Sequence, residues 1–119
     1  MKTTMFLLLL TAVPAAAADI SGVWKVDGSV ADHPVAPTCT LKQTDAKLTG
    51  TCKLPDMEAS DVTGDVKGKD VSWKFTVEYE GTQYTLTFAG ALDSDSSIKG
   101  SISVDPSGAD GDFTAKRQP

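Results

Sequence analysis

Side chains that could carry out chemistry are few in this sequence, and none of them forms a recognisable catalytic set. The single histidine, His33, stands in Asp32-His33-Pro34, where no nucleophile or orienting partner accompanies it. Residues 93–97 alternate oxygen ligands as a calcium loop does, but they lack the glycine and the distal glutamate of a helix-loop-helix site. A second acidic cluster comprises Asp105, Asp110 and Asp112. We interpret His33 and both clusters as solvated loops, and we expect no enzyme, no metal site and no cofactor.

The first 18 residues have the three parts of a secretory signal peptide. Lys2 supplies a positive charge, Met5–Leu10 is an apolar run, and Ala16-Ala17-Ala18 is a small-residue cleavage site. The apolar run is far shorter than the about 20 residues of a membrane-spanning helix. We therefore predict a signal peptide over residues 1–18, followed by a single domain over residues 19–119 that is secreted or periplasmic and has no membrane span.

Length and charge narrow the classes of partner. The chain has 119 residues, 23% of them charged, which is typical of one soluble domain. Its formal net charge is −5, and removal of Lys2 with the signal peptide makes it more negative. Because a negative chain without a basic patch repels a polyphosphate, we expect no nucleic-acid partner. We also expect a monomer.

Cys39 and Cys52 are the two cysteines of the chain. In the oxidising compartment reached by export, two cysteines predict one disulfide. Their spacing excludes a Cys-x-x-Cys redox motif, and together with one histidine they fall short of the four ligands of a structural zinc site. The chain-entropy model assigns such a bridge about 3 kcal/mol of stabilisation.

Apolar and polar residues alternate through most of the remaining sequence, with turn residues at short intervals, which is the pattern of an all-β protein. The predicted strands are Ile20–Gly28, Val35–Gln43, Lys47–Leu54, Asp61–Lys67, Asp70–Glu80, Thr82–Leu92, Ser97–Val104 and Gly111–Arg117. Because short loops join each strand to the next, we predict an up-and-down meander.

Residues that face each other in a hairpin have a constant sum of residue numbers, which allows each register to be tested. A four-residue loop, Thr44–Lys47, places Cys39 opposite Cys52 on one face, as a disulfide requires. The same arithmetic pairs Val66 with Val71, Tyr79 with Tyr84, and Phe88 with Ile102. The tyrosine pair either orients a ligand through its hydroxyl groups or, as we favour, stabilises the hairpin by ~0.2–1 kcal/mol.

These registers collect the apolar side chains on one face of the sheet, and that face must be buried. The predicted buried residues are Trp24, Val26, Leu41, Leu48, Leu54, Val62, Val71, Trp73, Phe75, Val77, Leu86, Phe88, Ile98, Ile102 and Phe113. Glycines recur on the same face at positions 22, 50, 64, 90, 100 and 111, where they permit sharp coiling of the strands or leave room beside the tryptophans. We therefore predict an eight-stranded antiparallel up-and-down β-barrel with one disulfide, in preference to a two-layer sandwich.

The loops of a meander alternate between the two ends of the barrel. One end receives only short loops, whereas the other receives Ser29–Pro34, Pro55–Ser60 and Asp105–Asp110, which are longer and contain proline. This asymmetry is typical of a barrel with a ligand mouth, and it is equally compatible with a barrel that binds nothing.

Gly22-Val23-Trp24 in the first strand and Lys116-Arg117 in the last resemble the calycin superfamily of lipocalins, fatty-acid-binding proteins and avidins. The resemblance implies that Trp24 plugs one end of the barrel and that Arg117 covers its indole ring. The chain also looks like small β-rich domains of secreted bacterial proteins, whose role is poorly defined. The segments that carry this second resemblance are Cys39–Thr51, Val62–Phe75 and Phe113–Gln118.

The leading hypothesis is an exported calycin-like binding module for a small, mostly apolar ligand. Candidate ligand-lining residues are Val26, Leu54, Trp73, Val77, Tyr79, Tyr84, Leu86 and Val104. A first alternative is a protein-interaction domain, because Ser21-Gly22-Val23-Trp24 and the bridged second and third strands resemble bacterial inhibitors of secreted metalloproteases. A second alternative is a structural barrel with a filled core.

Overall fold

The computed structural model describes residues 19–119, which form nine strands and no helix. The signal peptide predicted over residues 1–18 lies outside the described residues. The strands are β1 (Gly22–Val30), β2 (His33–Val35), β3 (Thr38–Thr44), β4 (Lys47–Lys53), β5 (Ser60–Lys67), β6 (Asp70–Tyr79), β7 (Thr82–Ser94), β8 (Ser97–Asp105) and β9 (Asp110–Arg117). Residues 19–119 contain no helix long and apolar enough to cross a membrane.

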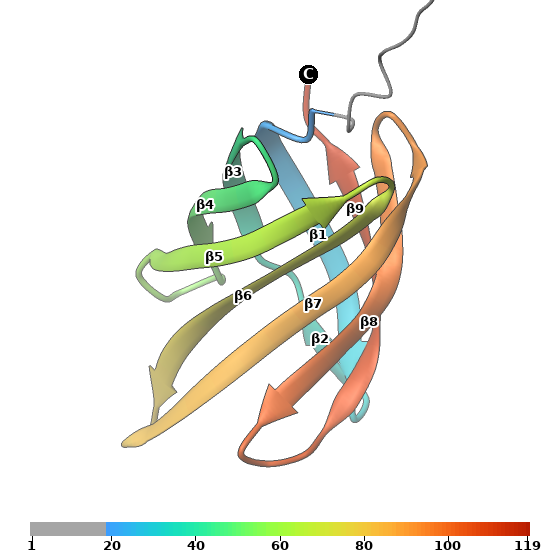
Figure 1. Ribbon diagram of the computed structural model, residues 1–119. Helices are drawn as coiled ribbons and strands as arrows, with labels where there is room; N and C mark the ends of the chain where they lie inside the picture. Colours follow the sequence, from blue (N-terminus) through green and yellow to red (C-terminus); the bar gives the residue numbers. More distant parts are fainter. Residues whose placement is uncertain (1–18) are drawn as a thin grey trace, which may run out of the picture.

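The nine strands make one closed antiparallel sheet with the order β2-β1-β3-β4-β5-β6-β7-β8-β9 (Figure 1). Closure comes from β1 and β9, which pair from Trp24 and Arg117 at one end to Val30 and Gly111 at the other. β2 and β3 both pair with β1, β3 with its first half and β2 with its second half. They therefore share one position in the wall, so the predicted eight-stranded up-and-down barrel is confirmed.

The predicted single strand over residues 35–43 is wrong, and so is the predicted loop Ser29–Pro34. The chain turns within two residues, Ala31 and Asp32, both at positive φ (50° and 68°), and this tight turn brings β2 back alongside β1. Pro37 then separates β2 from β3, because its nitrogen has no hydrogen to donate to a ladder. Its carbonyl oxygen accepts a 3.0 Å hydrogen bond from the Val26 N–H instead.

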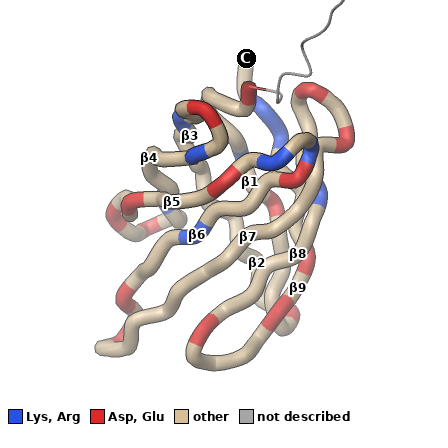
Figure 2. Tube along the Cα trace, viewed as in Figure 1, with Lys and Arg blue, Asp and Glu red and all other residues tan. Residues whose placement is uncertain are grey.

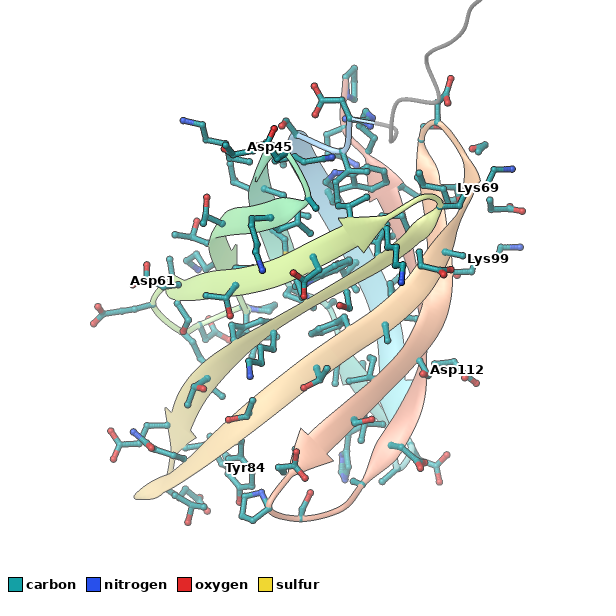
Figure 3. The ribbon with its side chains drawn as sticks, viewed as in Figure 1. Asp45, Asp61, Lys69, Tyr84, Lys99 and Asp112 are labelled. Carbon is teal, nitrogen blue, oxygen red and sulfur yellow. A yellow bond between two sulfur atoms is a disulfide. The ribbon has the colours of Figure 1, made fainter. Side chains whose placement is uncertain are left out.

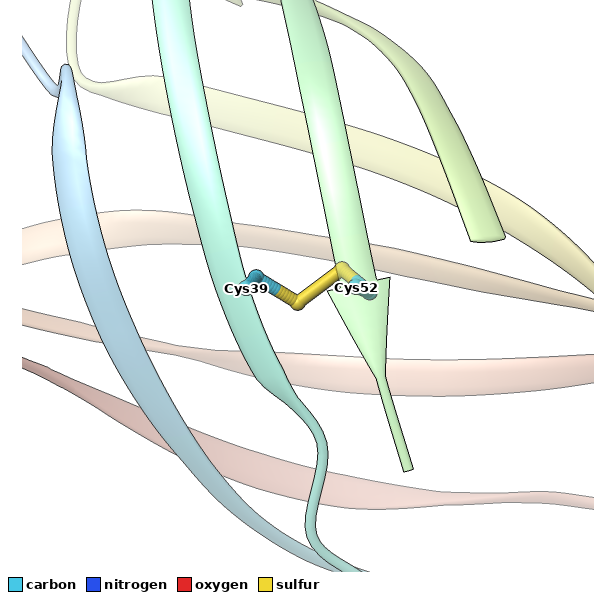
Figure 4. Close-up of a disulfide and its surroundings, with 2 residues drawn as sticks. All are labelled: Cys39 and Cys52. Atoms are coloured by element: carbon cyan, nitrogen blue, oxygen red, sulfur yellow. A yellow bond between two sulfur atoms is a disulfide. The ribbon is translucent and has the colours of Figure 1, made fainter. Parts of the chain in front are cut away.

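Three of the four predicted registers are confirmed. Cys39 faces Cys52 across β3 and β4, and the two residues form the predicted disulfide (Figure 4). Val66 faces Val71, and Phe88 faces Ile102. The agreement follows from side-chain alternation, because a slip of one residue would turn every apolar side chain of a strand toward water.

The predicted register between β6 and β7 is wrong by two residues. Tyr79 faces Thr82 rather than Tyr84, and Tyr84 faces Val77. The connection is a two-residue turn, Glu80-Gly81, with φ values of 52° and 82°, and positive φ at both central positions belongs to the type I′ turn that suits hairpins. A shift of two residues keeps every side chain on its predicted face, so the burial pattern survives the error.

The inward glycines let neighbouring strands approach each other closely. At Gly50, where φ is 137°, a methyl group would overlap the Thr40 carbonyl oxygen of β3. Four further glycines would likewise overlap backbone of the adjacent strand, namely Gly64, Gly90, Gly100 and Gly111. The space that each missing side chain leaves is occupied by backbone, so these glycines permit sharp coiling of the strands rather than leaving room beside the tryptophans.

Candidate binding end of the barrel

The end of the barrel at which the chain finishes is closed by Trp24 and Arg117. The guanidinium carbon of Arg117 lies 4.6 Å from the centre of the Trp24 ring, as the calycin resemblance implies. The Trp24 side chain has no exposed surface, and its Nε1–H donates a 2.9 Å hydrogen bond to the Ile20 carbonyl oxygen. This indole is therefore held by a polar contact at its edge and by a cation at its face.

Arg117 also fastens three parts of the chain to one another. Its guanidinium donates hydrogen bonds to the carbonyl oxygens of Ser21 (2.6 Å), Asp19 (2.9 Å) and Asp95 (3.1 Å). The Ser21 N–H donates to the Asp19 carboxylate at 2.9 Å, and this bond holds the pKa of the Asp19 carboxyl below its usual value. The start of the described chain, the β7–β8 loop and the last strand thus meet over Trp24, and they seal this end.

The middle of the barrel is filled by aromatic side chains. The Trp73 and Phe88 rings stack at 5.3 Å, and Phe75 stacks on Phe88 at 5.7 Å. Phe113 meets Trp73 and Phe88 edge-on at 5.6 and 5.3 Å. All four side chains are buried. A ligand that enters from the opposite end would therefore rest on this aromatic layer rather than pass through it.

Trp73 differs from Trp24 in its hydrogen bonding. Among residues 19–119, the Trp73 Nε1–H is the one buried side-chain polar group without a hydrogen-bond partner. A buried donor without a partner costs stability, about 1–3 kcal/mol. Trp73 is a candidate lining residue, and it lies in the aromatic layer itself.

The end opposite Trp24 carries apolar side chains that are only partly covered. Four candidate lining residues are half-buried there and pack against the core, namely Leu54, Val77, Tyr84 and Val104. Figure 3 shows Tyr84 near the far end of β7, away from Asp45 and the C-terminus. Val26 and Leu86 are buried, and Tyr79 is 59% exposed beside the β6–β7 turn. Leu54 and Val77 lie on the predicted buried face and pack against the core, but they are half-buried rather than buried because they belong to this open end.

Several hollows of the surface lie along the outer wall. One, of about 490 Å³, lies between the β4–β5 loop and β6. Its lining residues are Asp56, Met57, Glu58, Ala59, Ser60, Thr76, Val77 and Glu78. Sequence reasoning missed this site, although a signal was present. A predicted strand of seven residues, Asp61–Lys67, is followed after a short turn by one of eleven, Asp70–Glu80, so the second strand must extend beyond the first.

His33 and the two acidic clusters do not assemble into a site. His33 lies exposed in β2, so it is part of a strand rather than a loop. Within residues 19–119, no group of three or more His, Cys, Asp or Glu side chains is placed to hold a metal ion. Asp93 forms a 3.7 Å ion pair with Lys99, and both side chains are largely exposed.

Comparisons with known proteins agree with this geometry. No known family model and no curated protein matches the chain. A redesigned β-barrel, mFAP1, bound to DFHBI is similar in structure, with a TM-score of 0.61 and 15% identity over 82% of this chain and 94% of that one. The chain shares the fold of this barrel. A second redesigned barrel, b11L5F_LGL, has a TM-score of 0.67 and 16% identity over 92% of this chain and 100% of that one. A fluorescence-activating β-barrel of de novo design has a TM-score of 0.60 and 13% identity over 89% of this chain and 100% of that one.

Proposed function

We propose that this protein is an exported, calycin-like binding module that takes one small, mostly apolar ligand at the open end of its barrel. The difference between the two ends carries this proposal. Trp24, Ile20 and Ile98 at the closed end have no exposed surface, whereas Val77 and Tyr84 at the other end are half-buried. Covering apolar surface is favourable by about 25 cal/mol per Å², so a small apolar molecule gains most at the open end.

The aromatic layer sets the depth of the proposed site. Trp73 and Phe88 fill the barrel below Val77 and Tyr84, so the ligand lies above their rings and remains near the mouth. The Tyr84 hydroxyl supplies a polar group there, which would orient a ligand that carries one hydrogen-bonding atom. Binding of DFHBI by the similar barrel mFAP1 supports the use of this architecture for small ligands.

Titration of the purified protein with the apolar dye Nile red tests the proposal. We expect the dye fluorescence to rise and saturate at one dye per chain. Val77→Asn should weaken binding about tenfold, because an apolar ligand would bury the new amide without a hydrogen-bond partner, at a cost of about 1–3 kcal/mol. Leu92→Asn is the matched control, since Leu92 is also partly buried against the core but lies at the closed end, next to the Lys69 carbonyl group.

Three outcomes would contradict the proposal. One is a lack of saturable dye binding, which is what a structural barrel with a filled core predicts. Another is an equal loss of affinity in Val77→Asn and Leu92→Asn at matched thermal stability, because it would place the dye away from the open end. The third is a stoichiometry of several dyes per chain, which would indicate adsorption to the outer wall.

A further inference from the structure

Strand β6 extends beyond its neighbour β5. The two strands pair from Lys67 and Asp70 to Thr63 and Lys74, and there the pairing stops. β6 nevertheless continues to Tyr79, and it is paired with β7 over its whole length. Within residues 19–119, the segment 75–79 of β6 therefore has a strand on one side only. Figure 1 shows β5 and β6 diverging toward the β6–β7 turn.

The divergence follows from the pairing of β5 with β4. Ser60 faces Cys52 and Val62 faces Gly50, so the first residues of β5 stay with β4. At Gly50 and Gly64 the backbones come so close that a side chain would not fit, which coils this part of the wall. β5 thus follows β4 away from β6, and the wall opens beside residues 75–79.

An edge of this kind can bind another strand. Five extended residues span about 17 Å, and the N–H and C=O groups on the open side have no ladder partner. Met57 and Val77 are half-buried in the hollow of about 490 Å³ beside this edge. A strand laid along β6 would satisfy the backbone groups and cover these two side chains.

The acidic side chains of the hollow beside β6 favour a partner strand of positive charge. Asp56, Glu58 and Glu78 line it, and its eight lining residues include no lysine or arginine. Figure 2 shows acidic positions at the β4–β5 loop and at the far end of β6. A second copy of this chain fits poorly, because antiparallel pairing of two such edges would bring acidic groups of both copies into one groove. A basic segment has the complementary charge.

We infer that the open edge of β6, residues 75–79, binds an extended segment of a basic partner protein by strand addition. The partner strand alternates apolar and basic residues. Its apolar side chains cover Val77 and Met57, and its lysine or arginine side chains lie near Glu78 and the β4–β5 loop. Val77 borders both this groove and the open end of the barrel, so the partner strand and the proposed ligand would share that side chain, but strand binding does not require the ligand.

Synthetic peptides of eight residues provide the test. The first peptide alternates valine and lysine, and the second alternates valine and glutamate. The third is the first peptide with two of its valines replaced by proline, which prevents strand formation. Binding is measured by fluorescence polarisation, and hydrogen exchange locates it on the chain. We expect the valine–lysine peptide to bind, to protect amides of residues 75–79, and to bind at least tenfold more tightly than either of the other two.

Charge reversal within the groove sharpens the test. Glu78→Lys should weaken the valine–lysine peptide roughly fivefold and strengthen the valine–glutamate peptide. Asp112→Lys makes the same change of net charge on β9, away from the groove, and should alter binding less than twofold. Both side chains are exposed at the surface, so both variants should fold.

Several results would overturn the inference. Equal effects of Glu78→Lys and Asp112→Lys would mean that the peptide responds only to net charge. Equal binding of the proline peptide would exclude strand addition, and protection confined to other segments would move the site elsewhere. Dimerisation of the protein through residues 75–79 would assign the edge to a second copy instead.

Discussion

Arg117 and Ser21 are 96 residues apart in the chain, and the Arg117 Nη1–H donates a 2.6 Å hydrogen bond to the Ser21 carbonyl oxygen. Two further hydrogen bonds from the same guanidinium reach the carbonyl oxygens of Asp19 and Asp95. A single planar group thus joins the segment before the first strand, the last strand and the β7–β8 loop. The closed end of the barrel depends on this group together with the indole beneath it.

Arg117→Lys should lower the free energy of unfolding by about 2 kcal/mol, although the charge is kept. A planar guanidinium can donate to three carbonyl oxygens in its plane while its face stacks on Trp24, and the compact ammonium of lysine cannot do both. Urea denaturation measures the change. Lys116→Arg, the matched substitution at the neighbouring residue, should change stability by less than about 0.5 kcal/mol. Equal effects of the two substitutions would contradict the role assigned to Arg117.

The Cys39–Cys52 disulfide should contribute about 3 kcal/mol to the free energy of unfolding, since it closes a loop of 13 residues in the unfolded chain. The Cys39→Ser, Cys52→Ser double variant should lose this amount in denaturant titrations. Because both cysteines are buried, a reducing agent should act on the native protein far more slowly than on the denatured protein. Fast reduction without denaturant would show that β3 and β4 separate readily.

Gly50→Ala should destabilise the barrel by about 3 kcal/mol or more. The added methyl group meets the Thr40 carbonyl oxygen, and the φ of 137° is strained for alanine. Gly68→Ala is the control, because Gly68 also has positive φ (63°) but nothing lies within 4 Å of an added methyl group. Its cost should be about 1 kcal/mol. Similar melting temperatures for the two variants would show that backbone approach at Gly50 is unimportant.

The two tryptophans should respond differently to replacement by phenylalanine. Trp24→Phe removes a hydrogen bond to Ile20 and weakens the contact with Arg117, whereas Trp73→Phe removes an N–H that has no partner among the described residues. Both changes leave a similar void. We expect Trp24→Phe to cost about 2 kcal/mol more than Trp73→Phe in chemical denaturation. An equal cost would imply that the Trp73 N–H is satisfied in solution.

Alternation of apolar and polar residues predicted most of the core, the inward glycines added the closed sheet, and the cysteine count with the hairpin register added the disulfide. It failed where turn geometry decides. Glu80-Gly81 and Ala31-Asp32 are both two-residue turns. Ala31, Asp32 and Glu80 adopt positive φ there, which their residue types do not predict. The open-end residues Val77 and Tyr84 were found from side-chain parity, which holds even when a register slips by two. The edge of β6 was missed because parity tells which way a side chain points and not where two strands part.

The meeting of the first and last strands over Trp24 has a practical consequence. Gln118 donates its N–H to the Val23 carbonyl oxygen at 2.8 Å, so the tail of the protein leaves the barrel at its sealed pole. Anything fused or tethered behind Pro119 is thereby held at the pole opposite Val77 and Tyr84. A surface-anchored version of this molecule would present those two side chains to the solvent, away from the anchor.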